Sequence, residues 1–267
     1  MDKSILIIGL NSELAQNTIR ELKMNGWDIY ATSRQVGMMD DKIREFNLDV
    51  TSELDFIRLK EKLKEVKFDV ILNFAGIAIA SAVDELDEIE LKKQFDINVF
   101  GLLRIIKYLD SNLKENGRLI NISSMAEYGI FPFLSPYCMS KASADILLNT
   151  FSIETGRKVV SIRPGVIATK FWEASIELND RALKVKNEKY KEEKDFLINN
   201  ANKNSLHGAS PIATGKKIAQ IVELKNPKPV YNIGLDAKFA KLSRFLPQKL
   251  INCLVRFILK TRVQRKK

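Results

Sequence analysis

The chain has 267 residues, of which 45% are hydrophobic and 28% are charged, as in an ordinary globular protein with one large α/β domain or two small ones. The net charge of +10, from 43 basic and 33 acidic residues, arises in residues 238–267, because that stretch has ten basic residues and no acidic one. A nucleic-acid-binding domain is expected to spread its basic residues over a folded face, so no nucleic-acid partner is expected.

The two cysteines and the N-terminal segment bear on the compartment. Cys138 and Cys253 form neither a metal-ligand pattern with their neighbours nor a disulfide framework. The first apolar run, SILIIG, is too short for a membrane-spanning helix and resembles a first strand more than a signal peptide. We therefore expect a cytoplasmic protein and no metal site.

Short apolar runs alternate with amphipathic helical patterns along the chain. Strands are expected at residues 4–9, 27–32, 44–50, 68–76, 117–124 and 158–165. Helices are expected at residues 12–26, 51–66 with Thr51 as the cap, 87–114 as one long helix, 136–154, and from Pro211. Strands separated by helices imply right-handed crossovers and a doubly wound parallel sheet, which binds ligands beyond the carboxyl ends of its strands.

One stretch departs from this alternation. Residues 170–208 are rich in charge and asparagine, and they follow a strand end. We expect a long, partly helical excursion over the mouth of the site, with its single histidine, His207, at the surface. No Pro/Gly-rich linker divides the chain, so the predicted organisation is one domain over residues 1–236 followed by a tail over residues 237–267.

Two Tyr-x-x-x-Lys pairs occur, at Tyr137–Lys141 and at Tyr190–Lys194. Residues four apart share one face of a helix, and an ammonium beside a phenol lowers the tyrosine pKa from about 10. Such a tyrosine is a usable acid or base near neutral pH. Spacing alone does not choose between the pairs, and each is also compatible with a surface tyrosine beside a solvated lysine.

The segment LINISSMAEYGIFPFLSPYCMSK, residues 119–141, favours the first pair, Tyr137–Lys141, as the functional one. It resembles the short-chain dehydrogenase/reductase family of the shorter, single-domain type, and the resemblance runs over about residues 3–231. Ser124 lies 13 residues before Tyr137, the spacing usual in that family, whereas the position equally far before Tyr190 is Glu177. The resemblance implies a Rossmann-like fold, and the pair at Tyr190 is expected to be a solvated face.

By this resemblance, four residues form the active site. Ser124 hydrogen-bonds the substrate oxygen, and Tyr137 gives that oxygen a proton during reduction or takes one during oxidation. Lys141 lowers the Tyr137 pKa and holds the nicotinamide ribose. Asn98, in DINVFG, matches the family's helix asparagine, which holds a water that links Lys141 to a proton relay.

The first strand end is expected to cradle the cofactor's pyrophosphate at a helix N-terminus. The family's turn is Gly-x-x-x-Gly-x-Gly, and here it is GLNSELA, so Gly9 remains while Glu13 and Ala15 replace the later glycines. Glu13 adds negative charge near the phosphate site, and Ser12 or Asn11 is a candidate to donate a phosphate hydrogen bond instead.

The second strand ends in YATSR, where an NAD-preferring site typically has an acid. Arg34 instead favours a 2′-phosphate, so NADP(H) is preferred over NAD(H), although a solvated strand-end arginine is the alternative. The family also places Asp49 and Val50 near adenine, and Phe74 replaces its second turn asparagine. The candidate cofactor-binding residues are Gly9, Asn11, Ser12, Leu14, Ser33, Arg34, Asp49, Val50, Asn73, Ala75, Gly76, Tyr137, Lys141, Pro164, Gly165, Ile167 and Thr169.

The predicted function is interconversion of a carbonyl and a secondary alcohol by an NADP(H)-dependent oxidoreductase, in a homodimer or homotetramer. The alternatives are a non-catalytic nucleotide-binding or scaffolding homologue, suggested by the altered glycine turn, and an enzyme acting on a nucleotide sugar or a lipid-linked sugar. Candidates to line an apolar substrate pocket are Met125, Tyr128, Phe131, Phe133, Phe171 and Trp172. Several of these are equally suited to the core or to a dimer contact.

The tail is expected to form two short helices that are broken near Pro247. The second has a broad apolar face made by Leu250, Ile251, Leu254, Val255, Phe257 and Ile258, and basic residues Lys249, Arg256 and Lys260 on the other side. This pattern suits a helix on an anionic membrane surface. It equally suits packing on residues 170–208, the predicted excursion over the site, or on a second subunit.

Overall fold

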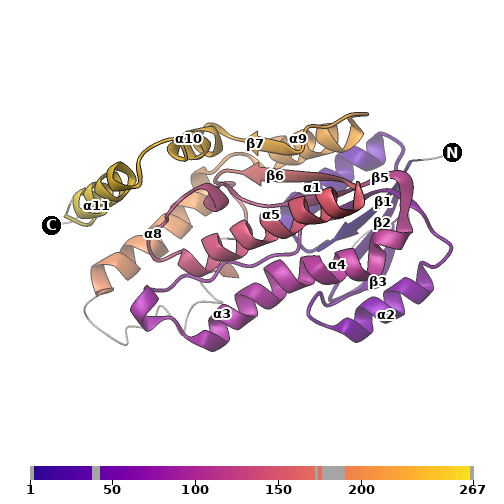
Figure 1. Cartoon of the computed structure of the whole chain (residues 1–267), viewed down its shortest axis with the longest axis horizontal. Helices are drawn as coiled ribbons and strands as arrows, with labels where there is room; N and C mark the ends of the chain where they lie inside the picture. Colours follow the sequence, from indigo (N-terminus) through magenta and orange to yellow (C-terminus); the bar gives the residue numbers. More distant parts are fainter. Residues whose placement is uncertain (1–2, 38–42, 172–173, 176–189, 265–267) are drawn as a thin grey trace.

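Seven parallel strands form a single sheet in the computed structural model (Figure 1), which describes residues 3–37, 43–171, 174–175 and 190–264. The strands are β1 (Ser4–Ile8), β2 (Asp28–Ser33), β3 (Arg44–Asn47), β4 (Phe68–Asn73), β5 (Leu113–Ile122), β6 (Lys158–Pro164) and β7 (Val230–Ile233). Their order in the sheet is β3-β2-β1-β4-β5-β6-β7. The order reverses between β1 and β4, so the doubly wound topology is confirmed and the carboxyl ends of these two strands form a switch point.

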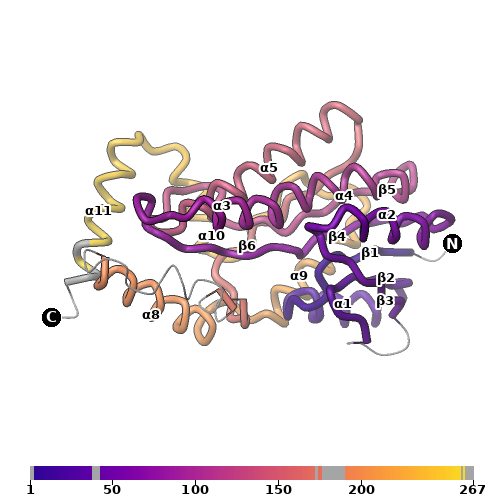
Figure 2. Tube along the Cα trace, turned by 90° about the horizontal axis from the view of Figure 1, so that it is seen from below, coloured from indigo at the N-terminus to yellow at the C-terminus, as the bar shows by residue number. Residues whose placement is uncertain are grey.

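Helices cover both faces of the sheet, as Figure 2 shows edge-on. On one face lie α1 (Glu13–Met24) and α9 (Pro211–Glu223), which pack against each other. On the other lie α2 (Glu53–Lys62), α3 (Glu88–Phe95), α4 (Gly101–Leu109) and α5 (Ser135–Thr155). Because each strand alternates its side chains, Ile5 and Ile7 of β1 enter the core under α1, while Leu6 and Ile8 enter the opposite core.

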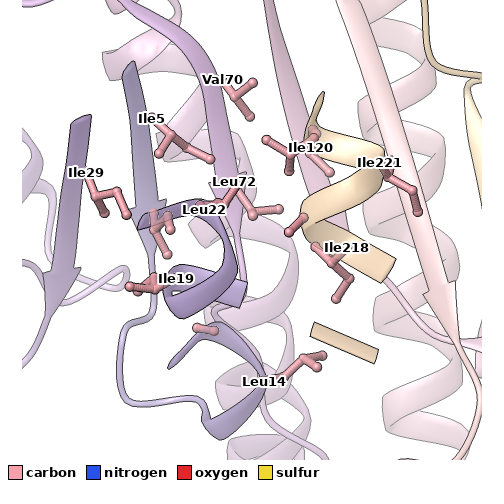
Figure 3. Packing of buried hydrophobic residues seen from close by; sticks show 14 of the residues in the cluster. Ile5, Leu14, Ile19, Leu22, Ile29, Val70, Leu72, Ile120, Ile218 and Ile221 are labelled. Carbon is pink, nitrogen blue, oxygen red and sulfur yellow. The ribbon is translucent and has the colours of Figure 1, made fainter. Parts of the chain in front are cut away.

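The core under α1 and α9 is made almost entirely of aliphatic side chains (Figure 3). Leu14, Ile19 and Leu22 repeat at helical spacing along α1 and meet Ile218 and Ile221 of α9. Burying a side chain of this size stabilises the fold by about 1.5–3 kcal/mol before entropy is counted. This packing fixes the start of α1 at the carboxyl end of β1.

The prediction of one long helix over residues 87–114 is wrong at the centre and at the C-terminal end. This stretch consists of α3, one π-helical turn η2 (Asp96–Phe100), α4 and a short 3-10 turn η3 (Asp110–Asn112). Asn112 ends the helical run because its side-chain amide donates to the carbonyls of Leu63 and Val66 at 2.7 and 3.0 Å. Lys114 therefore belongs to β5, not to the helix.

Thr51 is not the cap of α2, and this expectation is also wrong. The cap is Ser52, whose hydroxyl accepts from the Asp55 N–H at 3.2 Å. Thr51 instead donates its hydroxyl and its N–H to the Asp49 carboxylate at 2.7 and 2.9 Å. The competing Asx turn at Asp49 moves the helix start by one residue.

The described residues after β6 form three helices besides α9. They are α8 (Lys191–His207), α10 (Leu235–Ser243) and α11 (Gln248–Gln264), and the break at Pro247 between the last two lies where it was predicted. Figures 1 and 2 place α11 and α8 together at the end of the molecule away from the N-terminus, and the two helices contact each other. Among the described residues, no helix combines the length and the apolarity that crossing a membrane requires.

Candidate active site

A cavity of about 1700 Å³ opens at the switch point between β1 and β4. It is lined by many of the predicted site residues, namely Gly9, Asn11, Ser12, Ser33, Arg34, Asp49, Val50, Ala75, Gly76, Thr169 and Phe171. Other predicted contacts lie behind this wall: Leu14 and Ile167 are buried in the core under α1. Asn73 is buried where its amide donates to Asn121 at 2.8 Å, and its side-chain oxygen accepts from the Ala75 N–H at 3.0 Å.

The turn after β1 needs its one remaining glycine. Gly9 has φ +91°, and an added Cβ would lie 2.9 Å from the Ala75 backbone nitrogen. Ala15, in contrast, is fully buried in the core, so the third family glycine is replaced without a clash. Glu13 is the first residue of α1, and its carboxylate accepts from the Lys170 N–H at 3.4 Å. The α1 N-terminus thus faces the cavity with its free backbone N–H groups and one carboxylate.

Charge of both signs lies at the ends of β2 and β3. Burial raises the pKa of Asp49, but the hydrogen bonds from Thr51 and the positive charges of Arg34 and Arg104 outweigh it, so the pKa is lowered overall. Asp49 is therefore ionised at neutral pH. Ser33 donates its hydroxyl to the Gln35 carbonyl, and Arg34 lines the cavity beside it.

Tyr137 and Ser124 meet where α5 begins beyond the end of β5. Tyr137 is buried, and its ring lies 6.3 Å from that of Phe171 between centroids. Ser124 is the cap of a 3-10 turn, η4 (Met125–Tyr128), where its hydroxyl accepts from the Ala126 N–H at 3.1 Å. Burial raises the pKa of Tyr137 to about 12, and a hydrogen bond with Ser124 acts weakly in the other direction. The phenol is therefore protonated at neutral pH.

Lys141 lies one turn further along α5, with its Nζ 5.7 Å from the centroid of the Tyr137 ring. The ammonium donates to the Ile122 carbonyl at 3.0 Å. Burial lowers the Lys141 pKa to about 8, against the opposing charge of Asp145. The expectation that Lys141 lowers the Tyr137 pKa is therefore wrong, because burial of the phenol raises that pKa.

Asn98 lies in the π-helical turn η2, and its side chain is fully engaged. The side-chain oxygen accepts from the Ile77 N–H at 2.9 Å, and the amide donates to the Ile77 carbonyl and to the Ser140 hydroxyl at 3.0 and 2.9 Å. An added Cβ on Gly76 would lie 3.3 Å from Lys141 Nζ and 3.4 Å from Asn98 Oδ1. Because Gly76 has no side chain, the Lys141 ammonium and the Asn98 amide oxygen can both lie close to it. Asn98 itself lies in a π-helical turn, a feature that is frequent at functional sites.

The predicted substrate residues divide into three groups. Phe171 borders both the cavity and Tyr137, and Phe131 packs with it around Tyr137 and Ala126. Met125 is half-buried in η4, and Phe133, with φ 64°, contacts the Tyr190 ring instead. Trp172 lies outside the described residues.

Tyr128 belongs to a buried charge network that the sequence analysis missed. Its hydroxyl accepts from the guanidinium of Arg163, which also pairs with Asp145 and with Glu127 at 2.8 Å each. Asp145 further accepts from Ser123 and Ser161, at 3.1 and 2.8 Å. The available signal was that Asp145 follows Lys141 by four residues, on the same face of α5. Burial raises the pKa of Glu127 despite the nearby Arg163.

The pair at Tyr190 is not a solvated face, and that expectation is wrong. Lys194 is only 3% exposed and lies 2.7 Å from the Glu85 carboxylate in the 3-10 turn η1 (Val83–Glu85). Tyr190 donates to Asp84 at 2.9 Å. Both residues hold α8 against η1. The second Tyr-x-x-x-Lys pair is therefore a structural contact.

The sequence is similar to known oxidoreductases. A profile of the family described as short chain dehydrogenase matches residues 3–180. A 3-amino-tetrahydro-pyrrolizinone reductase of Xenorhabdus hominickii is 30% identical, over 91% of each chain. A 3-ketodihydrosphingosine reductase of Bacteroides thetaiotaomicron is 27% identical, over 94% of this chain and 96% of that one. An NADPH-dependent 1-acyldihydroxyacetone phosphate reductase of Schizosaccharomyces pombe is 26% identical, over 75% and 72%.

Solved structures agree on the fold. A short-chain dehydrogenase from Streptomyces avermitilis has a TM-score of 0.76 at 20% identity, over 100% of this chain and 98% of that one. A short-chain dehydrogenase from Burkholderia cenocepacia in complex with NADP has a TM-score of 0.73 at 17% identity, over 95% and 97%.

Proposed function

Because the chain belongs to the short-chain dehydrogenase family and is an NAD(P)-dependent oxidoreductase, we propose that it interconverts a carbonyl and a secondary alcohol with NADP(H), using Tyr137 as general acid or base. The observation that carries this proposal is that Tyr137, Ser124, Lys141 and Asn98 converge behind the part of the cavity wall formed by Gly76 and Phe171, although none of the four itself lines the cavity. Tyr190, the other candidate, is engaged with Asp84 and Phe133 instead.

The residues present fit a nicotinamide dinucleotide. The α1 N-terminus offers backbone N–H groups for the pyrophosphate, Arg34 offers a guanidinium for a 2′-phosphate, and Lys141 offers an ammonium for the ribose. When bound, this cofactor supplies the hydride. The carboxylate of Glu13 opposes a phosphate at the α1 N-terminus, and it accepts a hydrogen bond from the Lys170 N–H.

The protein's own part of the reaction is proton transfer. The Tyr137 hydroxyl, which is protonated at neutral pH, gives its proton to the carbonyl oxygen during reduction. The Ser124 hydroxyl donates to the same oxygen and stabilises its developing charge. Lys141, with a pKa of about 8, loses or gains a proton near neutral pH and can restore the one that Tyr137 gives.

The substrate is proposed to be apolar or lipid-like. Phe74, Phe95, Phe100, Met139 and Phe171 line the cavity, which is large enough for a molecule beyond the cofactor. Two relatives are named for reduction of ketones in lipid molecules, a ketodihydrosphingosine and an acyldihydroxyacetone phosphate. Long-chain ketones should therefore be better substrates than short ones with the same carbonyl.

The test is NADPH oxidation against a panel of carbonyl compounds that differ in chain length and charge. We expect turnover that rises with the length of the apolar chain and needs Tyr137. Cofactor binding without turnover on any compound would favour a non-catalytic homologue. A preference for sugar nucleotides would favour the alternative enzyme class.

A homodimer is proposed from the outer face of α4 and α5. Ile146 and Ile153 of α5 are 68% and 85% exposed and lie two helical turns apart, and Leu103 of α4 is 42% exposed. These residues provide apolar side chains on which a second copy could pack. Light scattering of the purified chain should give twice the mass of one chain.

A further inference from the structure

The C-terminal helix α11 presents apolar side chains to solvent. Phe257 is 65% exposed, and Leu250, Leu254 and Ile258 are each 45% exposed. These four residues, the α11 face, recur at helical spacing on one side of the helix. Isolated exposed apolar residues are ordinary, but a continuous face of them marks a site of interaction. Phe239, Leu242 and Phe245, just before α11, are also exposed.

The rest of the described chain does not cover this face. The helix α11 contacts α8, and the half-buried Ile251, Val255 and Leu259 follow a different line along the helix from the α11 face. The sequence suggested that the tail packs either on residues 170–208 or on a second subunit. Packing of α11 on α8, which belongs to residues 170–208, leaves the α11 face free for another partner.

The charge of the tail indicates what kind of surface the α11 face contacts. The stretch 238–267 has ten basic residues and no acidic one, and Lys249 and Arg256 are exposed on the side of α11 opposite its apolar face. A second copy of the chain on this face would bring two such stretches together, since a two-fold contact uses the same surface twice. An anionic lipid surface instead accepts the apolar side chains and attracts the basic ones.

We propose that α11 and the segment before it lie on an anionic membrane surface, with the α11 face in the lipid and the basic residues at the headgroups. This proposal goes beyond the proposed oxidoreductase activity. Because α11 contacts α8, docking would bring α8 close to the lipid as well.

The test is sedimentation of the full chain with vesicles of phosphatidylcholine alone or of equal parts phosphatidylcholine and phosphatidylglycerol. We expect binding to the anionic vesicles at low salt, weaker binding at high salt, and little binding to the neutral vesicles. Lys249→Glu with Arg256→Glu should lower the partition coefficient at least about 25-fold, at roughly fivefold for each basic residue. The matched control, Lys60→Glu with Lys62→Glu on exposed α2, should bind like the wild type apart from a few-fold effect of net charge.

The apolar contribution needs its own pair of variants. Phe257→Ser should lower binding about tenfold or more, whereas Leu54→Ser, at a site on α2 that is 63% exposed, should leave it unchanged. Both sites are exposed, so neither variant should unfold, and circular dichroism checks this. Tyr137→Phe should sediment like the wild type, which separates this proposal from the proposed activity. The proposal is overturned if the full chain stays in the supernatant with anionic vesicles at low salt, or if Phe257→Ser changes the oligomeric mass and not the sedimentation.

Discussion

Tyr137 and Lys141 are both buried, and burial moves their pKa values in opposite directions, to about 12 and about 8. Each shift favours the neutral form of the side chain. The tyrosine is therefore ready to donate a proton, and the lysine can change its charge near physiological pH. This pairing suits reduction, in which the tyrosine must be protonated when the carbonyl arrives.

The lysine shift has a consequence for stability. Between about pH 8 and its ordinary pKa of 10.5, Lys141 is protonated in the unfolded chain but neutral in the folded one, so stability rises with pH in that window. Lys141→Met removes this dependence. The free energy of unfolding of the variant relative to the wild type should fall by about 3 kcal/mol from pH 7 to pH 10.5, as measured by urea denaturation. Lys60→Met on exposed α2 is the control, and a constant difference for Lys141→Met would contradict the shifted pKa.

Arg34 carries the proposed preference for NADP(H). A charge-assisted contact to a 2′-phosphate is worth roughly 1.5–3 kcal/mol, so NADPH should bind about tenfold to a hundredfold more tightly than NADH. Arg34→Ala should remove most of that ratio by weakening NADPH alone, as fluorescence titration of both cofactors can measure. Arg58→Ala, on exposed α2, should keep the ratio. Equal dissociation constants in the wild type would refute this role.

At the residue scale, the sequence was informative where spacing and strand ends coincide. The separation of Ser124 from Tyr137 led to the pair that lies beside the cavity region. The sequence was misleading at Lys194, because a lysine in a charged stretch gives no sign that it pairs with a distant carboxylate such as that of Glu85. Thr51 and Ser52 are equally good caps by type, and only the hydrogen bonds of Asp49 and Asp55 decide between them.

At the element scale, α5 is fixed to β5 and β6 by buried polar contacts. Asp145 of α5 accepts from Ser123, Ser161 and Arg163, and Lys141 of the same helix donates to Ile122 at the end of β5. These contacts set the position of Tyr137 relative to Ser124. They form because the inner face of α5 is polar at both Lys141 and Asp145, one turn apart.

Asp145→Asn tests this arrangement. It leaves the buried Arg163 with a weaker partner, and breaking a buried ion pair costs about 3–5 kcal/mol. Asp110→Asn is a matched control, because Asp110 pairs with Arg157 at the same 2.8 Å distance but with about a third of its side chain exposed. Its loss should be at most about 1 kcal/mol. Similar losses in the two variants, measured by denaturant unfolding, would show that burial of the Asp145 pair contributes little.

The sequence predicted which helices and strands exist better than it predicted the residues at which they begin and end. The helix over residues 88–109 was expected from its apolar periodicity, but the π-helical turn at Asn98 depends on contacts with Ile77 and Ser140 from other segments. The start of β5 at Leu113 was missed because Lys114 and Glu115 favour a helix over a strand, and pairing with β4 overrides that preference.

At the scale of the whole molecule, the fold was predictable because alternating strands and helices permit few topologies. The doubly wound order then places every strand-end motif at one edge of the sheet, where the cavity lies. The tail differs, because the apolar α11 face is exposed and does not belong to the core of this domain. We propose that residues 237–267 act as a docking extension, whose first helix, α10, packs on η4 and β7 of the domain.

We propose that Tyr137, and not Tyr190, transfers the proton. The measurement is the single-turnover rate of NADPH oxidation with the best carbonyl substrate, together with the NADPH dissociation constant, for the wild type, Tyr137→Phe and Tyr190→Phe. We predict that Tyr137→Phe lowers the rate by a factor of about 100 to 10,000 with little change in cofactor binding, while Tyr190→Phe stays within a few-fold of the wild type. A Tyr137→Phe rate close to that of the wild type, or an equal loss in Tyr190→Phe, would show that Tyr137 is not the proton donor.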